Sequence, residues 1–139
     1  MKRLIYKNPD GSLRIVIPVN LTKSLKEIRA DAEAKDPAMA QCTYVGEVEE
    51  SDIPQTREFR SCWRLNGSKV RVDPALETEE RWKRVRVQRD KLLAESDGNM
   101  LRAKDLNQKV SEWESYRQAL RDIPTQSDPK TIVWPTRPS

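Results

Sequence analysis

The chain has 139 residues, of which 35% are charged and 36% hydrophobic, and a formal net charge of +4. This length suits one domain or two small modules with modest cores, and the apolar residues that recur throughout argue against wholesale disorder. No apolar run approaches the roughly 20 residues that a membrane-spanning helix needs. The apolar start breaks at residues 7–11, too early for a signal-peptide core, so we expect synthesis in the cytosol.

Histidine is absent, and the only two cysteines are Cys42 and Cys62. The commonest general base is therefore missing, and neither a Gly-rich phosphate loop nor a Gly-x-Ser-x-Gly motif occurs. No Cys-x-x-Cys pair could anchor a zinc ion. The acidic run at residues 47–52 is too polar to favour a paired-carboxylate site. We expect a protein without enzymatic activity, metal or cofactor, in which both cysteines are small buried side chains.

Two β-hairpins and one helix are predicted in the first half of the chain. Residues 3–7 and 13–19 read as strands joined by the turn Asn8-Pro9-Asp10-Gly11. A helix over residues 24–34 should start at the capping box of Ser24 and Glu27 and stop at Asp36-Pro37. A third strand is expected over residues 41–48. A second hairpin, residues 58–65 and 69–72, should turn at Asn66-Gly67.

From residue 75 the apolar periodicity changes to that of helices. Asp73-Pro74 is typical of a helix start, and Asp97-Gly98 of its end. A second helix should begin near Asp105, which has capping-box spacing to Gln108, and should close at Ile123-Pro124. The predicted contacts between the two helices come from Trp82, Val85 and Leu92 on the first and from Leu106, Val110, Trp113 and Leu120 on the second.

The sequence thus predicts an α+β fold: a small antiparallel sheet with one helix, then a C-terminal helical hairpin and an extended proline-rich tail. We expect a small α+β domain over residues 1–74, the hairpin over 75–124 and the tail over 125–139. The apolar Ile132, Val133 and Trp134 interrupt the polar tail. They could fold back onto the hairpin as a brace or be presented to a partner, and the sequence leaves both open.

Positive charge is concentrated only in residues 81–91. On a helix these basic side chains wrap around the axis instead of forming one stripe, and Trp82 lies on the apolar face where it cannot stack on bases. We therefore favour a solvated helix surface that can also meet acidic proteins. Nucleic-acid binding is the less favoured alternative.

Three blocks follow one another in the last third of the chain. They are Arg89-Asp90-x-Leu92-Leu93-x-x-Ser96-Asp97, then Trp113-x-x-Tyr116-Arg117-Gln118-x-Leu120-Arg121-Asp122-Ile123-Pro124, and finally Ile132-Val133-Trp134-Pro135. With these blocks, residues 82–136 resemble the C-terminal module of tailed-bacteriophage tail assembly chaperones and tail-fibre assembly proteins. The chain departs from that family at Gly98, where many members have Trp, and at residues 99–109, which lack the usual proline before the second helix.

The resemblance implies a phage protein that acts by binding: an assembly chaperone that binds a tail or tail-fibre protein and promotes its folding, trimerisation or attachment. It would work in the host cytoplasm during phage assembly, away from membranes, and a homo-oligomer is compatible with that role. The amino-terminal sheet would supply partner specificity or attachment. One alternative is a structural virion component, a tail or fibre adaptor retained in the mature particle. Another is a nucleic-acid-binding or host-interacting phage regulator that uses residues 81–91.

Tyr116, Arg117, Arg121 and Trp134 are the predicted partner contacts. Aromatic and arginine side chains on one amphipathic edge have the composition of binding hot spots. In the alternative reading, Arg89 and Arg117 pair with Asp122 or Asp97 and lock the hairpin. The sequence leaves these two readings equally open.

Overall fold

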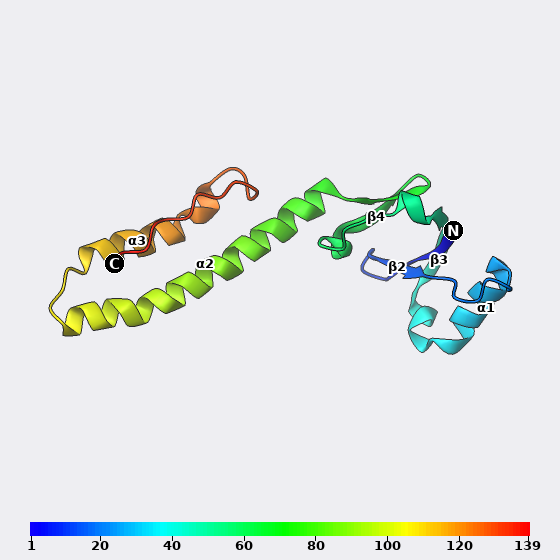
Figure 1. The fold of residues 1–139 in the computed structure, drawn as a ribbon, viewed down its shortest axis with the longest axis horizontal. Helices are drawn as coiled ribbons and strands as arrows, with labels where there is room; N and C mark the ends of the chain where they lie inside the picture. The colour runs from blue at the N-terminus through cyan, green and yellow to red at the C-terminus, as the bar shows by residue number, and fades with distance from the viewer. The chain divides into compact units, whose positions relative to one another are not determined.

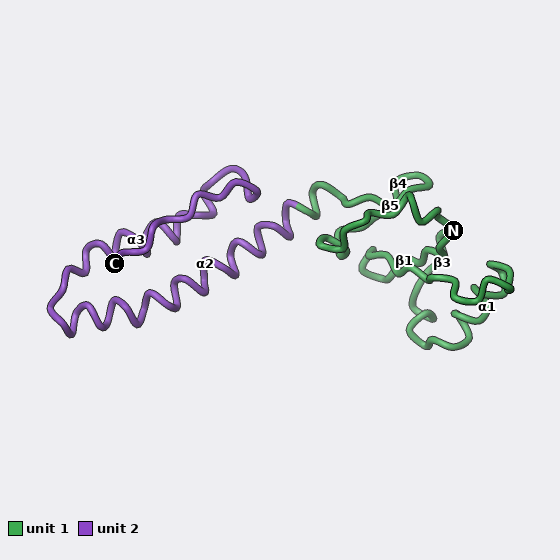
Figure 2. The backbone as a smooth tube through the Cα atoms, viewed as in Figure 1, with its two compact units in different colours: residues 1–77 green, residues 78–139 purple.

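A computed structural model describes residues 1–139, which form two compact units, residues 1–77 and 78–139 (Figure 2). The strands, the first helix and the first turn of the long second helix lie in the first unit, and the rest of that helix, a third helix and the tail make up the second (Figure 1). The predicted α+β fold class is therefore confirmed. The elements are β1 (Lys2–Lys7), β2 (Leu13–Val16), α1 (Leu25–Lys35), β3 (Thr43–Glu49), β4 (Trp63–Asn66), β5 (Lys69–Val72), α2 (Pro74–Asp105) and α3 (Ser111–Arg121).

The first unit is built around β1, the central strand of an antiparallel sheet with the order β2-β1-β3. Its residues Leu4, Ile5 and Tyr6 are all at most 1% exposed, because both faces of the strand are covered. The predicted turn between β1 and β2 is present, and Gly11 takes φ 88° in it. The second strand is shorter than predicted and ends at Val16.

Helix α1 covers the face of the sheet that carries Leu4 and Tyr6, together with Met39 of a 3₁₀ helix (Pro37–Gln41). The predicted capping box is confirmed: the Ser24 side chain accepts from the Glu27 N–H, and the Glu27 carboxylate accepts from the Ser24 N–H at 2.7 Å. The helix stops at Asp36, one residue before the proline.

The hairpin β4–β5 covers the opposite face, where Trp63 and Val70 pack against Ile5. Gly67 adopts φ 63°, the positive value required at the first central position of a primed turn. The predicted first strand began too early, since residues 60–62 form a 3₁₀ turn before β4.

Helix α2 begins at Pro74 as predicted. Asp73 Oδ1 accepts hydrogen bonds from the backbone N–H groups two and three residues on, at 3.0 and 3.1 Å, and so caps the helix. The predicted end at Asp97-Gly98 is wrong, because α2 continues through Gly98 to Asp105. A glycine inside a helix costs only about 1 kcal/mol relative to alanine. Ser96 and Ala103, on either side of Gly98, are both buried, so the helix is packed on both sides of the glycine.

The true end of α2 is set by Asn107, whose φ is 55°. The N–H of Gln108 donates to the C=O of Ala103 at 2.8 Å, and the N–H of Asn107 donates to the C=O of Lys104 at 3.1 Å. These two bonds form a Schellman motif, and asparagine is one of the few residues that tolerate the left-handed conformation it needs.

Helix α3 begins at Ser111, so the predicted start at Asp105 and its capping box with Gln108 are wrong. Leu106, predicted to be a core residue, lies in the connection between the helices and is 55% exposed. The helix ends before Ile123-Pro124, as predicted. Figure 1 shows α3 and the tail running beside the second part of α2.

The first prediction concerns the core of this hairpin. Leu120 is 0% exposed, whereas Leu106 is 55% exposed. Leu120→Ala should lower the free energy of unfolding by about 2 to 5 kcal/mol, because it leaves a cavity. Leu106→Ala, the same change at a solvated site, should alter it by about 0.5 kcal/mol or less. Denaturant titration of both variants checks this, and equal losses would contradict the helix boundary described above.

The second prediction concerns pH. Tyr6 is buried and its hydroxyl donates to Glu33 Oε1 at 2.9 Å. Burial, with the neighbouring carboxylate, raises the pKa of Tyr6 to about 12. Because the folded-state pKa is raised, this contribution to stability is fully present below the unfolded pKa of about 10 and is lost as pH rises through about 12.

We therefore expect alkaline titration of phenolate absorbance to contain a late step near pH 12. Tyr6→Phe should remove that late step. The absence of a step near pH 12 while the fold persists, or its survival in the Tyr6→Phe variant, would contradict the assignment.

Candidate partner-binding surface of the C-terminal unit

The three sequence blocks meet in one hydrophobic cluster. Leu92 and Leu93 come from α2, Tyr116 and Leu120 from α3, and Trp134 from the tail. Val85, Tyr116, Leu120 and Ile123 are its buried members, and Trp82, Trp113 and Ile132 pack against them. Residues far apart in the sequence thus form a single core for residues 78–139.

Arg117 links α3 to α2 through three acceptors. Its Nη1 donates to the C=O of Leu93 at 3.1 Å and to Ser96 Oγ at 2.7 Å, and it pairs with Asp97. Ser96 is only 1% exposed, and its own hydroxyl donates to the C=O of Leu93 at 2.7 Å. The guanidinium is thus held at the point where the two helices touch, and the small serine side chain leaves room for it.

The tail folds back onto the hairpin, as in the brace alternative. Gln126 uses both ends of its amide on one residue: Nε2 donates to the Val133 C=O and Oε1 accepts from the Val133 N–H, each at 3.0 Å. Trp134 then packs on the hydrophobic cluster, and the Arg137 guanidinium lies 5.7 Å from the centre of the Trp113 ring.

The four predicted contact residues differ in how much surface they offer. Tyr116 is 7% exposed, with its ring edge-on to Trp113, and Arg117 is engaged in the network above. Trp134 is half-buried, and Arg121 is exposed and forms no ion pair. The locking pair of Arg117 with Asp97 is present, whereas Arg89 pairs with Asp90 and not with α3.

An apolar stripe on α2 was missed by sequence reasoning. Val87 is 71% and Leu101 63% exposed, with Ala94 midway between them, also exposed, so the three recur every seven residues on one helix face. Gly98 on the same side has open space where a Cβ would stand. The stripe is visible only if the helix continues past Gly98, which the sequence reading did not allow.

Two findings bear on other kinds of site. The structure contains no group of three or more His, Cys, Asp or Glu side chains that could hold a metal ion. No helix is both long and apolar enough to cross a bilayer.

Residues 82–139 match the family model described as phage tail assembly chaperone protein. Neither the curated proteins nor the solved structures include a significant match to the chain. This match confirms, for residues 82–139, the resemblance to phage tail assembly chaperones inferred from the three blocks.

Proposed function

We propose that the protein is a non-enzymatic chaperone that binds a tail or tail-fibre protein in the infected host cell and holds it ready for assembly. The match of residues 82–139 to the chaperone family carries this proposal. A fibre chain exposes apolar surface until its partner chains arrive, and such surface aggregates. A small protein that covers it suppresses that loss and favours folding and trimerisation.

Partner contact is assigned to the surface groups of the second unit. Arg121 offers an unpaired guanidinium, half-buried Trp134 an aromatic edge, and neighbouring Val133 is 76% exposed. Arginine and tryptophan are the residue types most enriched in binding hot spots. Tyr116 and Arg117 support this surface from within, because Arg117 holds α3 against α2 and Tyr116 belongs to the cluster on which the tail packs. The stripe of Val87 and Leu101 gives the partner a second apolar strip.

The third prediction tests this assignment by coexpression with the tail-fibre protein of the same phage. Arg121→Ala and Trp134→Ala should each reduce the yield of soluble trimeric fibre severalfold, while the thermal midpoint of the Arg121 variant stays unchanged. Lys104→Ala, which removes the same charge from an exposed site on α2, is the matched control and should leave the yield intact.

Arg117→Ala distinguishes a residue that stabilises the hairpin from one that contacts the partner protein. Since it leaves Asp97 and Ser96 without their partner, its own thermal midpoint should fall along with the fibre yield. Normal fibre yield without the protein would refute the chaperone proposal. Stoichiometric presence of the protein in purified particles would instead indicate a structural tail or fibre adaptor.

A further inference from the structure

The first unit, outside the family match, carries an open strand edge. Strand β2 is at one side of the sheet and pairs only with β1. Asn8 N–H donates to Ser12 C=O at 2.8 Å. Because hydrogen-bonded and non-hydrogen-bonded pairs alternate along an antiparallel pair of strands, this bond shows which residues of β2 face β1. Ser12, Arg14 and Val16 therefore bond toward β1. The N–H and C=O groups of Leu13 and Ile15 point the other way, to the free edge.

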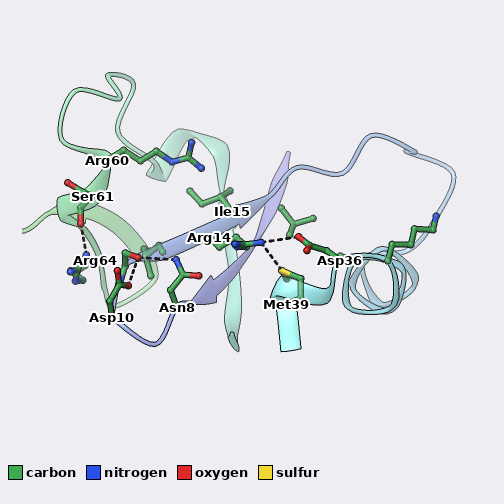
Figure 3. A pocket seen from close by; sticks show the side chains of 14 residues that line it. Asn8, Asp10, Arg14, Ile15, Asp36, Met39, Arg60, Ser61 and Arg64 are labelled. Atoms are coloured by element: carbon green, nitrogen blue, oxygen red, sulfur yellow. Dashed lines mark hydrogen bonds and ion pairs between the residues drawn. The ribbon is translucent and has the colours of Figure 1, made fainter. Parts of the chain in front are cut away.

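This edge runs along a groove of about 830 Å³. One wall is formed by the end of α1 and the following 3₁₀ helix, with Lys35, Asp36 and Met39. The other wall is formed by Arg60, Ser61 and Arg64. Figure 3 shows Arg60, Ser61 and Arg64 on one side of the strand that bears Arg14 and Ile15, and Asp36 and Met39 on the other. A strand laid against β2 would thus have a wall on each face.

The groove has an excess of positive charge, since Arg14, Lys35, Arg60 and Arg64 line it against Asp10 and Asp36. Both carboxylates are already engaged: Asp36 pairs with Arg14 at 2.9 Å, and Asp10 accepts from the Ser12 N–H at 2.9 Å.

Three cationic side chains of the groove form no salt bridge. The pKa of the Asp10 carboxyl is lowered chiefly by its hydrogen bonds from Ser12, and Arg64 lies near enough to help lower it. Arg64 Nη1 donates only to the backbone C=O groups of Ser61 and Trp63, at 2.9 and 2.8 Å. Lys35 and Arg60 are exposed and form no ion pair. The groove therefore offers positive charge on both walls that a ligand can neutralise.

We propose that this groove binds an extended acidic segment of a partner protein as an added strand. Backbone groups of the segment pair with Leu13 and Ile15, and its carboxylates, at alternate positions, face Arg60 and Arg64 or Lys35. The apolar Ile17, 50% exposed just beyond the strand, extends the contact. This binding site is independent of the chaperone surface on the second unit.

A second copy of the chain is a poorer occupant. Its own acidic edge strand is β3, but Glu47 there pairs with Lys2 at 3.4 Å, and Glu49 with the N-terminal amine at 3.3 Å. Those carboxylates are already neutralised within the molecule. The groove charges therefore favour a different chain with free carboxylates.

The fourth prediction uses the full-length protein and dye-labelled peptides, with fluorescence anisotropy as the measurement. A short peptide that alternates Glu and Val should bind at least about tenfold tighter than one that alternates Lys and Val, the size expected for two surface ion pairs. Two further peptides carry backbone N-methyl groups, one on its Glu residues and the other on its Val residues. Only one of these two peptides should lose binding. In an added strand only alternate N–H groups face β2.

The double variant Lys35→Glu with Arg60→Glu should weaken binding of the Glu-Val peptide about tenfold. Lys26→Glu, a charge reversal at an exposed site of α1 outside the groove, should not change it. Equal affinity for the two peptides, or equal tolerance of both methylation patterns, would overturn the proposal even if the double variant failed to fold. Sedimentation could also show that the protein self-associates and that self-association releases the bound peptide. That result would identify a second copy as the occupant and would also overturn the proposal.

Discussion

The second unit depends on the placement of one cation between two helices. Arg117 is mostly withdrawn from solvent, with 18% of its side chain exposed, and all three of its acceptors belong to one turn of α2. A guanidinium in this position must keep its hydrogen-bond partners, because a buried donor left unsatisfied costs about 1 to 3 kcal/mol, and more when it is charged. Sliding α3 by one turn would remove them. We infer that Arg117 fixes the register of the hairpin, while the apolar cluster provides most of the stability.

Local signals with a direct backbone mechanism could be predicted from the sequence. Ser24 with Glu27, and Asp73 before Pro74, satisfy backbone N–H groups at helix starts, so their effect does not depend on the rest of the fold. The turn at residues 8–11 could be predicted for a similar reason, because proline and glycine set its backbone conformation locally. For the candidate site, the apolar periodicity indicated a helical hairpin, and the pairing of Arg117 with Asp97 was one of the alternatives that the sequence left open.

Features decided by tertiary packing could not be read in advance. Gly98 carries a stop signal in isolation, but the buried neighbours of α2 override it, and Asn107 ends the helix by adopting a conformation that no spacing rule flagged. Because the predicted helix ended at Gly98, the exposed apolar stripe that includes Leu101 was not predicted. Whether Trp134 packs on the hairpin or is presented to a partner also depended on contacts between residues far apart in the sequence. The structure places this side chain on the hydrophobic cluster, with part of it still exposed.

The double hydrogen bond of Gln126 has a chemical consequence. One amide serves Val133 as both acceptor and donor, which is what a neighbouring strand would otherwise provide. Hydrolysis of that amide to glutamate would keep the size of the side chain but replace its donor with a second acceptor, facing the Val133 carbonyl oxygen. The tail would then be repelled at the residue next to Trp134. Slow deamidation on storage is therefore a specific route by which this protein could lose its docked tail while the contacts between α2 and α3 stay intact.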